Sequence, residues 1–339
     1  MSRPAAAAAL AVAALLAGPA PGAGQARPGD RVTVTAGRMA MGTVLEISLV
    51  TGDVARGRAL AETLFGLAAD LDRLLTTYEP ESPLNRLSTA AGQGPQAVDP
   101  SLARILAESV AYAARTGGAF DVSVGPLVEL WIEAARRDRP PDDAELARAL
   151  ARVGSEKIRV EGARVELAAP GMRLDLGGIA KGWALDRMGE ILRREGVGDA
   201  LLDFGQSSIL ALGRPADAPA WSVALRGAGG GIAGLLELRD RGFSVSGSLG
   251  QWSEIGGRRY GHVIDPRSGR ALERNLQVAV VAPSAGQAEA WSTALVVLGP
   301  EGLALLEREP GVEAWLQEEG GASHATPGWA RSVGFEALP

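Results

Sequence analysis

The segment from Leu174 to Asp186 constrains the fold most strongly, because it combines three backbone signals in one short stretch. Its first three residues alternate apolar, polar and apolar, which predicts the end of a half-buried strand. Gly177 and Gly178 follow at once and indicate a tight turn. Gly196 marks the end of a predicted helix, whose apolar residues recur at helical spacing: Ile179, Trp183, Met188, Ile191 and Leu192.

A glycine turn that leads into a helix can bind a phosphate or another anion. Free backbone N–H groups and the positive end of the helix dipole would meet at this point, and Lys181 would add a charge in the first helical turn. The alternative is that the glycines serve only the geometry of a tight connection. Taken alone, the segment favours this alternative slightly, because it matches neither a Walker loop nor a dinucleotide G-x-G-x-x-G.

The other predicted elements surround this segment without a strict alternation of strands and helices, which favours an α+β fold. Apolar periodicity predicts helices over 53–75, 99–116, 127–135, 142–153, 285–297 and 301–307. Short alternating runs predict strands over 32–35, 44–49, 158–160, 164–167, 200–203, 209–212, 221–225, 235–238, 243–245, 262–264, 277–282 and 313–316. Proline and glycine predict irregular backbone over 77–83 and a hairpin at Gly256-Gly257.

The amino-terminal sequence predicts export. Arg3 precedes an Ala/Leu/Val run from Ala5 to Ala17, and small residues follow up to Ala26, as in a secretory signal peptide. We therefore expect a signal peptide over 1–26, a single domain over 27–339 and a periplasmic protein, with an uncleaved anchor as the alternative. No later segment is apolar for long enough to cross a membrane. The sequence has no cysteine, which excludes disulfides, thiolate sites and a lipoprotein cysteine.

Composition excludes one class of partner. The chain has 339 residues, is 46% hydrophobic and carries a formal net charge of -6, so it can bury a substantial core. A negative chain without a basic stretch is not typical of a nucleic-acid-binding protein.

Two residue pairs are candidates for chemistry. Glu289 and Thr293 lie four residues apart on a predicted helix, so their oxygens share one face and can bind a hard cation such as Mg²⁺. His262 precedes Asp265 by three residues, and the carboxylate could orient the imidazole as a general base. Each pair alone is more often a solvated or packing pair. A serine hydrolase has little support, because no G-x-S-x-G occurs near Ser246 or Ser207.

Taken together and in order, several segments of the chain resemble the ApbE family of FAD:protein FMN transferases. They are Met41-Gly42-Thr43, Tyr78 to Leu87, Gly118-Ala119-Phe120-Asp121, Leu174 to Asp186, Ser246-Gly247, His262 to Pro266 with Gly269, and Glu289 to Leu298. The resemblance covers nearly the whole chain after residue 26. It implies an ApbE-like α+β fold of mixed, largely antiparallel sheets flanked by helices.

The resemblance also implies a periplasmic, Mg²⁺-dependent enzyme with FAD as its substrate. Such an enzyme transfers FMN to a threonine or serine of an acceptor flavoprotein subunit, through a phosphoester bond, and releases AMP. The implied magnesium ligands are the Ala180 carbonyl, Glu289 and Thr293. The implied flavin-nucleotide contacts are Met41, Tyr78, Ala119, Phe120, Asp121, Gly177, Trp183, His262 and Ile264. Lys181 would face phosphate, and His262 with Asp265 would take the proton of the attacking hydroxyl.

Three departures from the family pattern keep alternatives open. Glu289 replaces the usual Asp, Gly205-Gln206-Ser207 replaces Gly-Gly-Asp/Asn, and Ser248-Leu249-Gly250 replaces acidic or aromatic residues. The alternatives are a Mg²⁺-dependent FAD pyrophosphatase that gives FMN and AMP, and a periplasmic flavin-binding protein without turnover.

Overall fold

An antiparallel sheet of eight strands forms the centre of the protein in the computed structural model, which describes residues 31–248 and 252–337. The predicted signal peptide, residues 1–26, lies outside the described residues. The strand order is β1-β2-β6-β7-β10-β13-β14-β15, and every neighbouring pair is antiparallel. The bounds are β1 Val32–Ala40, β2 Thr43–Thr51, β6 Ala200–Phe204, β7 Ser208–Leu212, β10 Arg241–Gly247, β13 Leu276–Ala282, β14 Glu313–Glu318 and β15 Ser323–Ala325. This confirms the predicted α+β class.

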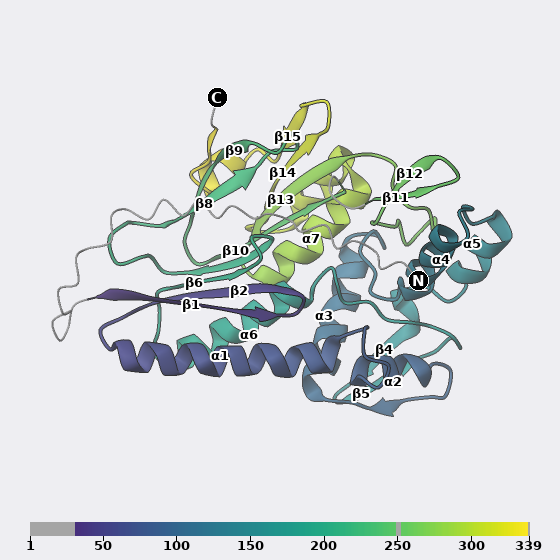
Figure 1. Cartoon of the computed structure of the whole chain (residues 1–339), viewed down its shortest axis with the longest axis horizontal. Coiled ribbons are helices and arrows are strands. Elements are labelled where there is room, and N and C mark those ends of the chain that lie inside the picture. The colour runs from purple at the N-terminus through teal and green to yellow at the C-terminus, as the bar shows by residue number, and fades with distance from the viewer. Residues whose placement is uncertain (1–30, 249–251, 338–339) are drawn as a thin grey trace, which may run out of the picture.

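Three long helices cover one face of this sheet (Figure 1). They are α1 (Val54–Leu75), α6 (Ala180–Arg194) and α7 (Ala285–Leu298). Asp53 caps α1, and Gly196, the predicted end of the central helix, follows α6 with a φ of 74°. Leucines of α1 and the tryptophans Trp183 and Trp291 pack against the helix-facing side chains of the strands, which forms the main hydrophobic core.

A smaller layer covers the opposite face of the sheet. It contains β8 (Trp221–Arg226), β9 (Ile232–Leu238), β16 (Glu336–Ala337) and α8 (Trp329–Ser332). Trp221, Leu236 and Trp329 pack there against the other side of β7, β10 and β13. The even and odd residues of the central strands therefore face two separate cores, as the two-residue period of a strand requires.

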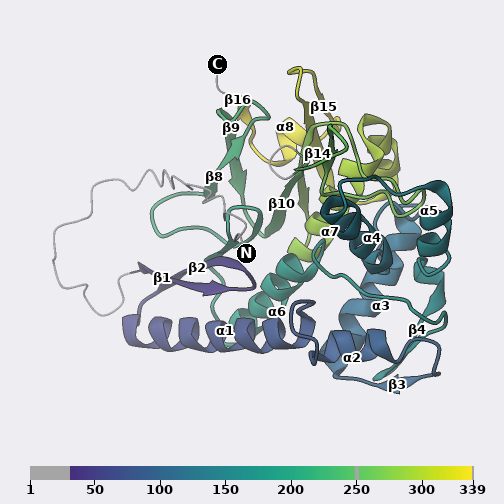
Figure 2. The same cartoon turned by 45° about the vertical axis from the view of Figure 1, so that its right-hand side comes forward.

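The remaining elements lie beside one end of the sheet (Figure 2). They are α2 (Pro83–Thr89), α3 (Pro100–Arg115), α4 (Gly125–Arg136), α5 (Asp143–Leu150), β3 (Gln96–Ala97), β4 (Ile158–Glu161), β5 (Arg164–Leu167), β11 (Trp252–Ile255) and β12 (Arg258–Gly261), with short 3₁₀ helices at Ser155–Lys157 and Pro300–Arg308. Strands β11 and β12 form the hairpin predicted at Gly256-Gly257, and the strands predicted over 158–160 and 164–167 pair as a second hairpin, β4 with β5. Helices α4 and α5 share a third hydrophobic cluster with Ile255, Tyr260 and Ile264.

Two predicted strands are wrong. Residues 174–176 are irregular, and the nearest pairing is an isolated bridge from Arg173 to Val124. The Leu176 carbonyl accepts the N–H groups of Ile179 and Ala180 instead, so the chain turns toward α6 too early for a strand. The predicted strand over 262–264 is replaced by a bend and one bridge from Ile264 to Ala271, because β12 already ends at Gly261.

Two predicted segments differ in the type or extent of helix. The expected helix over 301–307 is a 3₁₀ helix, and α2 follows the irregular segment after Tyr78 without having been predicted.

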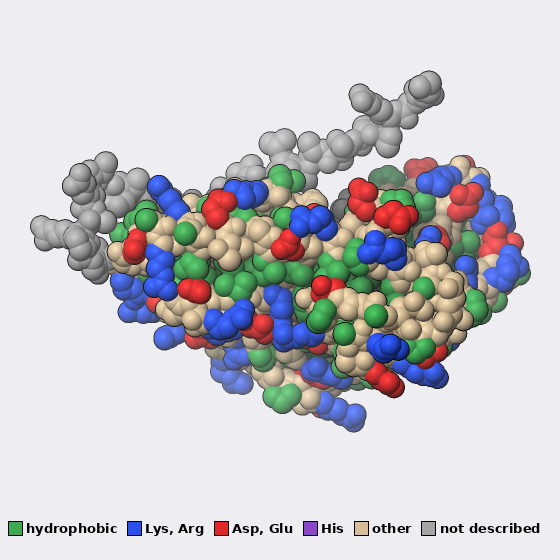
Figure 3. All heavy atoms as spheres, turned by 90° about the horizontal axis from the view of Figure 1, so that it is seen from below, with side chains coloured by type: hydrophobic (Ala, Val, Ile, Leu, Met, Phe, Trp, Pro, Cys, Tyr) green, Lys and Arg blue, Asp and Glu red, His purple; other side chains and the backbone are tan. Residues whose placement is uncertain are grey.

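The surface carries charges of both signs. Figure 3 shows Lys and Arg interspersed with Asp and Glu on one face of the molecule, with hydrophobic side chains between them. Within residues 31–248 and 252–337, no helix is long and apolar enough to cross a membrane.

Candidate functional site

A cavity of about 1110 Å³ lies where the amino end of α6 meets α7. Its walls come from segments that are distant in sequence. They are the β1–β2 turn, the loop after α1, residues 119–128, residues 175–181, the β6–β7 turn, the end of β10, residues 262–266 and one face of α7. The predicted glycine turn therefore lies at the cavity wall, as expected.

Glu289 is the central ionic group of this cavity. Its side chain is 4% exposed and comes from the first half of α7. One carboxylate oxygen, Oε1, lies 2.7 Å from the Lys181 ammonium, and Oε2 accepts the backbone N–H of Gly182 at 2.5 Å. The carboxylate thus holds two groups from the first turn of α6.

The predicted metal ligands share the cavity with this ion pair. Ala180, Glu289 and Thr293 all line the cavity, and the Thr293 hydroxyl lies 3.4 Å from the Gly178 carbonyl. A Cβ on Gly178 would lie 3.1 Å from the Thr293 hydroxyl oxygen, so the glycine allows this close approach. One carboxylate, one hydroxyl and one carbonyl are oxygen donors of the kind that suits a hard divalent cation.

These donors do not form a cage of acidic residues. The described residues contain no cluster of three or more His, Cys, Asp or Glu side chains that could hold a metal. A cation at Glu289 would therefore complete its coordination with water or with oxygens of a substrate, as Mg²⁺ commonly does.

The expected free N–H groups at the amino end of α6 are mostly occupied, which corrects the sequence prediction. Gly182 donates to Glu289, Ala180 donates to the Leu176 carbonyl, and Gly177 donates to the Asp175 carboxylate at 2.8 Å. The anion at the positive end of this helix is the protein's own Glu289.

Asp186 fixes the relative position of the two helices. Its two carboxylate oxygens accept the N–H groups of Ala285 and Gly286, both at 2.8 Å, at the first turn of α7. Burial raises the pKa of Asp186 to about 6, although these N–H groups oppose the shift. Gly182 permits the contact, because a Cβ there would lie 2.3 Å from the Ala285 carbonyl oxygen.

The rim of the cavity contains an unusual turn. Met41 and Gly42 join β1 to β2 with φ values of 47° and 78°, so Met41 adopts a left-handed conformation that non-glycine residues rarely take. The Met41 N–H donates to the Asp72 carboxylate of α1 at 3.3 Å. Tyr78 lies on the neighbouring loop and is 93% exposed. Left-handed strain at a cavity rim is typical of a functional position.

Most predicted flavin-nucleotide contacts line this cavity, but Trp183 does not. Those at the wall are Met41, Tyr78, Ala119, Phe120, Asp121, Gly177, Lys181, His262 and Ile264. Trp183 is 1% exposed and belongs to the main core. It follows Lys181 by two residues, or about 200° around the helix, so the two side chains point in opposite directions.

Two predicted carboxylates are committed to the protein itself. Asp121 accepts the N–H and hydroxyl of Ser123 and the N–H of Ser155, which braces the cavity wall. Asp265 binds the Arg267 guanidinium with both oxygens, at 2.9 and 2.8 Å. Burial would raise the pKa of Asp265, but the hydrogen bonds from Arg267 outweigh burial and lower it.

Several cavity residues carried no prediction. Asp72 and Asp175 contribute carboxylates, and Ser207 and Ser208 contribute hydroxyls near the β6–β7 turn. Gly205 and Gln206 form this turn with φ values of 58° and 61°, so the departure at Gln206 falls on a left-handed position. The short polar turn Gly205 to Ser208 was the available sequence signal. The departure at Leu249 and Gly250 lies outside the described residues.

Comparisons with known proteins agree on one family. The sequence model of the ApbE family matches residues 41–316. The FAD:protein FMN transferase of Klebsiella pneumoniae (strain 342) is 32% identical over 302 residues, which are 86% of this chain and 85% of that protein.

Two solved structures are similar over nearly their whole length. The apo flavinyl transferase ApbE of Pseudomonas stutzeri has a TM-score of 0.79 at 29% identity and covers 90% of this chain and 98% of its own. The flavin transferase ApbE of Vibrio cholerae has a TM-score of 0.78 at 26% identity, with 89% and 99% covered.

Proposed function

Because the chain belongs to the ApbE family, we propose that it transfers FMN from FAD to a threonine or serine hydroxyl of an acceptor protein and releases AMP. The observation that carries the proposal is the cavity, in which one buried carboxylate, a hydroxyl and a lysine converge. Every residue that lines it falls within the matched range 41–316. The sequence of residues 1–26 supports export, so we propose the periplasm as the place of the reaction.

The reaction exchanges the phosphoanhydride bond of FAD for a phosphoester bond to the acceptor. The acceptor oxygen attacks the phosphorus on the FMN side of the pyrophosphate, the bond to the AMP phosphate breaks, and AMP leaves with the electron pair. The acceptor hydroxyl loses its proton, and we assign this proton to the imidazole of His262, which lines the cavity. Asp265 would act indirectly, because its bonds to Arg267 shape the loop after His262.

The pyrophosphate is polyanionic, so attack by a hydroxyl requires positive charge nearby. The residues that would hold Mg²⁺ are Glu289, Thr293 and the Ala180 carbonyl. When bound, the ion would offset the charge of the phosphates and bring them close to the donors. Lys181 adds a positive charge at the same wall.

The flavin nucleotide would occupy the rest of the cavity. Met41, Phe120 and Ile264 supply apolar surface for an aromatic ring, and Gly177 lets the backbone approach. The exposed Tyr78 ring can turn onto a bound flavin, and Trp183 supports the wall from the core.

Incubation of the purified protein with FAD, Mg²⁺ and a flavin-bearing subunit of a respiratory complex tests the proposal. We expect a fluorescent acceptor band in a denaturing gel and an equal amount of AMP. An acceptor whose target threonine is replaced by alanine should give neither. AMP release of the same size without any acceptor would identify a pyrophosphatase instead, and FAD binding without AMP would identify a flavin-binding protein without turnover.

A further inference from the structure

The two members of the Lys181–Glu289 ion pair differ in their exposure to the cavity. Glu289 is almost completely buried, whereas the Lys181 side chain is 24% exposed and reaches it from the cavity side. Both carboxylate oxygens are already bound, one to the Lys181 ammonium and the other to the Gly182 N–H. A cation that approaches Glu289 from the cavity therefore meets a positive charge already paired with it.

A buried carboxylate needs such a partner. An ionised group that is removed from water without a counter-charge costs several kcal/mol, and the loss of one member of a buried pair leaves the other uncompensated. Gly182 supplies one hydrogen bond but no full charge. Within the described residues, the ion pair of Glu289 is the one with Lys181.

We propose that Lys181 is the resident counter-ion of Glu289 and that a divalent cation binds by replacing its ammonium. The released ammonium then becomes available to the phosphates of the substrate at the same wall. Cation and dinucleotide would therefore favour each other's binding, since linkage makes such coupling reciprocal. The second step depends on the proposed function, whereas the competition between Lys181 and the cation does not.

The length of the Glu289 side chain supports this inference. The side chain extends from α7 and brings both carboxylate oxygens to the first turn of α6. Lys181 and Gly182, the two groups that Glu289 binds, are neighbours in that turn.

The test is a Mg²⁺ titration of the full protein without FAD, followed both by calorimetry and by the melting temperature. The sequence has two lysines, which gives a matched control. Lys181→Met removes the competing charge, whereas Lys157→Met removes a lysine that binds the Ala151 carbonyl at 3.2 Å outside the cavity. We expect Lys181→Met to bind Mg²⁺ about tenfold more tightly than the wild type, because a like charge beside the cation is lost.

The melting temperature gives a second readout. Lys181→Met should melt lower than the wild type without Mg²⁺ and recover on its addition, because the cation then neutralises the buried Glu289. Lys157→Met should show the wild-type affinity for Mg²⁺, and Lys181→Gln should repeat the effect if the methionine variant does not fold.

Unchanged or weaker Mg²⁺ binding by both Lys181 variants would overturn the inference, as would the absence of binding in wild type and variants alike. This outcome is separate from failure of the proposed function. FMN transfer is measured in its own assay, and tighter Mg²⁺ binding by Lys181→Met would support the exchange even if no acceptor were flavinylated.

Discussion

Glu289 pairs with Lys181, and it is the carboxylate among the three proposed metal ligands. A neutral residue can fill neither role. Glu289→Gln keeps the shape but removes the charge. We expect the rate of AMP release to fall by at least about 100-fold, since the loss of a metal's charged ligand removes several kcal/mol of transition-state stabilisation. The measurement is initial rate against Mg²⁺ concentration, with circular dichroism as a check on folding.

Glu289→Asp is the matched control, because it keeps the carboxylate and shortens the side chain by one methylene. It should retain Mg²⁺-dependent activity. Near-wild-type activity of Glu289→Gln would contradict the assignment of Glu289 as a metal ligand.

Met41 is held in a left-handed turn where Asn-Gly would be the favoured pair. A side chain other than Gly, Asn or Asp costs about 1 kcal/mol in this conformation, so its methionine is better explained by the cavity than by the turn. Met41→Asn should raise the KM for FAD about tenfold through the lost apolar contact. The melting temperature should stay close to the wild-type value, since relief of strain offsets the lost packing.

The same substitution at Gln206 separates the relief of backbone strain from the effect on FAD binding. Gln206 has a φ of 61° and does not line the cavity, whereas Met41 does. Gln206→Asn should therefore leave the KM for FAD unchanged. An unchanged KM in Met41→Asn as well would show that Met41 has no role in binding.

Strands β2 and β6 place two carboxylates opposite each other, Glu46 and Asp203. Burial raises the pKa of Asp203 to about 6, Glu46 adds to the shift, and the N–H of Gln206 opposes it. A raised pKa in the folded state means that this site stabilises the fold below about pH 4 and that the contribution is lost as the pH rises through 6.

Asp203→Asn should therefore stabilise the protein at neutral pH and not at pH 4. The amide oxygen can still accept the Gln206 N–H, and the repulsion from Glu46 disappears. We expect a gain of about 1–2 kcal/mol in the free energy of unfolding at pH 7.5, after allowance for partial exposure. Urea unfolding at both pH values measures it, and an equal gain at pH 4 would show that the charge of Asp203 is not the cause.

Elements with local signals were predictable from the sequence. The helices predicted over 53–75 and 99–116 are α1 and α3, capped by Asp53 and Asp99, because helical periodicity and capping depend on neighbours in sequence. Residues 174–176 and 262–264 were wrong because alternation alone does not supply a strand partner. Tertiary contacts decide those segments, such as the bond from the Asp175 N–H to the Val122 carbonyl.

In the candidate site, too, features with a local sequence signal were predictable and those made by distant residues were not. The spacing of Glu289 and Thr293 was enough to place both oxygens at one cavity. Lys181 was predicted to face phosphate, but its pairing with Glu289 joins residues 108 positions apart and has no local signal. Trp183 was assigned from the resemblance alone, and its helical angle from Lys181 would have placed it in the core.

At the scale of the whole molecule, the cavity has two walls with separate cores. One wall is built on the large sheet with α1, α6 and α7, and the other on α4, α5 and the β11–β12 hairpin. Trp131 of α4 belongs to the second wall. Its ring centroid lies 4.9 Å from that of Tyr260, and its indole N–H donates to the Gly269 carbonyl at 2.9 Å. His262 follows β12 directly, so the position of this wall sets the position of the proposed base.

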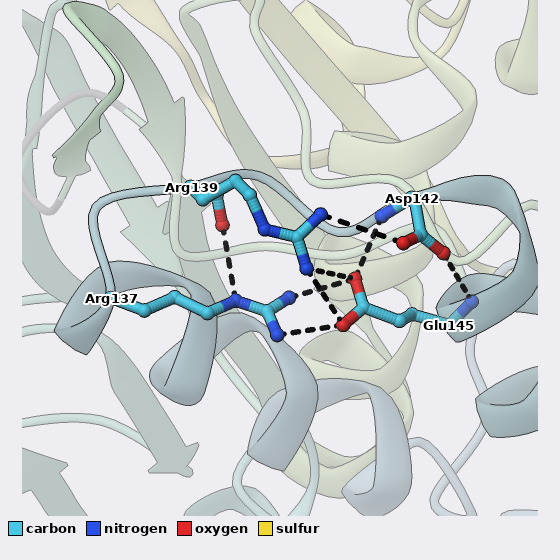
Figure 4. A network of polar contacts seen from close by, with 4 residues as sticks. All are labelled: Arg137, Arg139, Asp142 and Glu145. Atoms are coloured by element: carbon cyan, nitrogen blue, oxygen red, sulfur yellow. Dashed lines mark hydrogen bonds and ion pairs between the residues drawn. The ribbon is translucent and has the colours of Figure 1, made fainter.

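A polar network in the α4–α5 loop supports that wall (Figure 4). Glu145 binds the Arg137 guanidinium at 2.6 and 2.8 Å, binds Arg139 at 3.0 and 3.1 Å, and completes a capping box with Asp142. Asp138, between the two arginines, is held at a φ of 50° and accepts the Gly256 N–H of the β11–β12 turn at 2.7 Å. The network therefore connects α5 to the hairpin.

Glu145→Gln should destabilise the β11–β12 hairpin and leave the eight-stranded sheet unaffected. The hydrogen bonds from Arg137 and the Asp142 N–H lower the pKa of Glu145 to about 2. The network therefore contributes fully above about pH 4.5 and is lost as the pH falls through 2, so at neutral pH the charge matters. We expect faster amide exchange in β11 and β12 with little change in β6 and β7, and a higher KM for FAD. Glu133→Gln, which removes a carboxylate 3.8 Å from the exposed Arg136, should change neither. Uniformly faster exchange in both sheets of the Glu145 variant would mean that the two walls do not loosen independently.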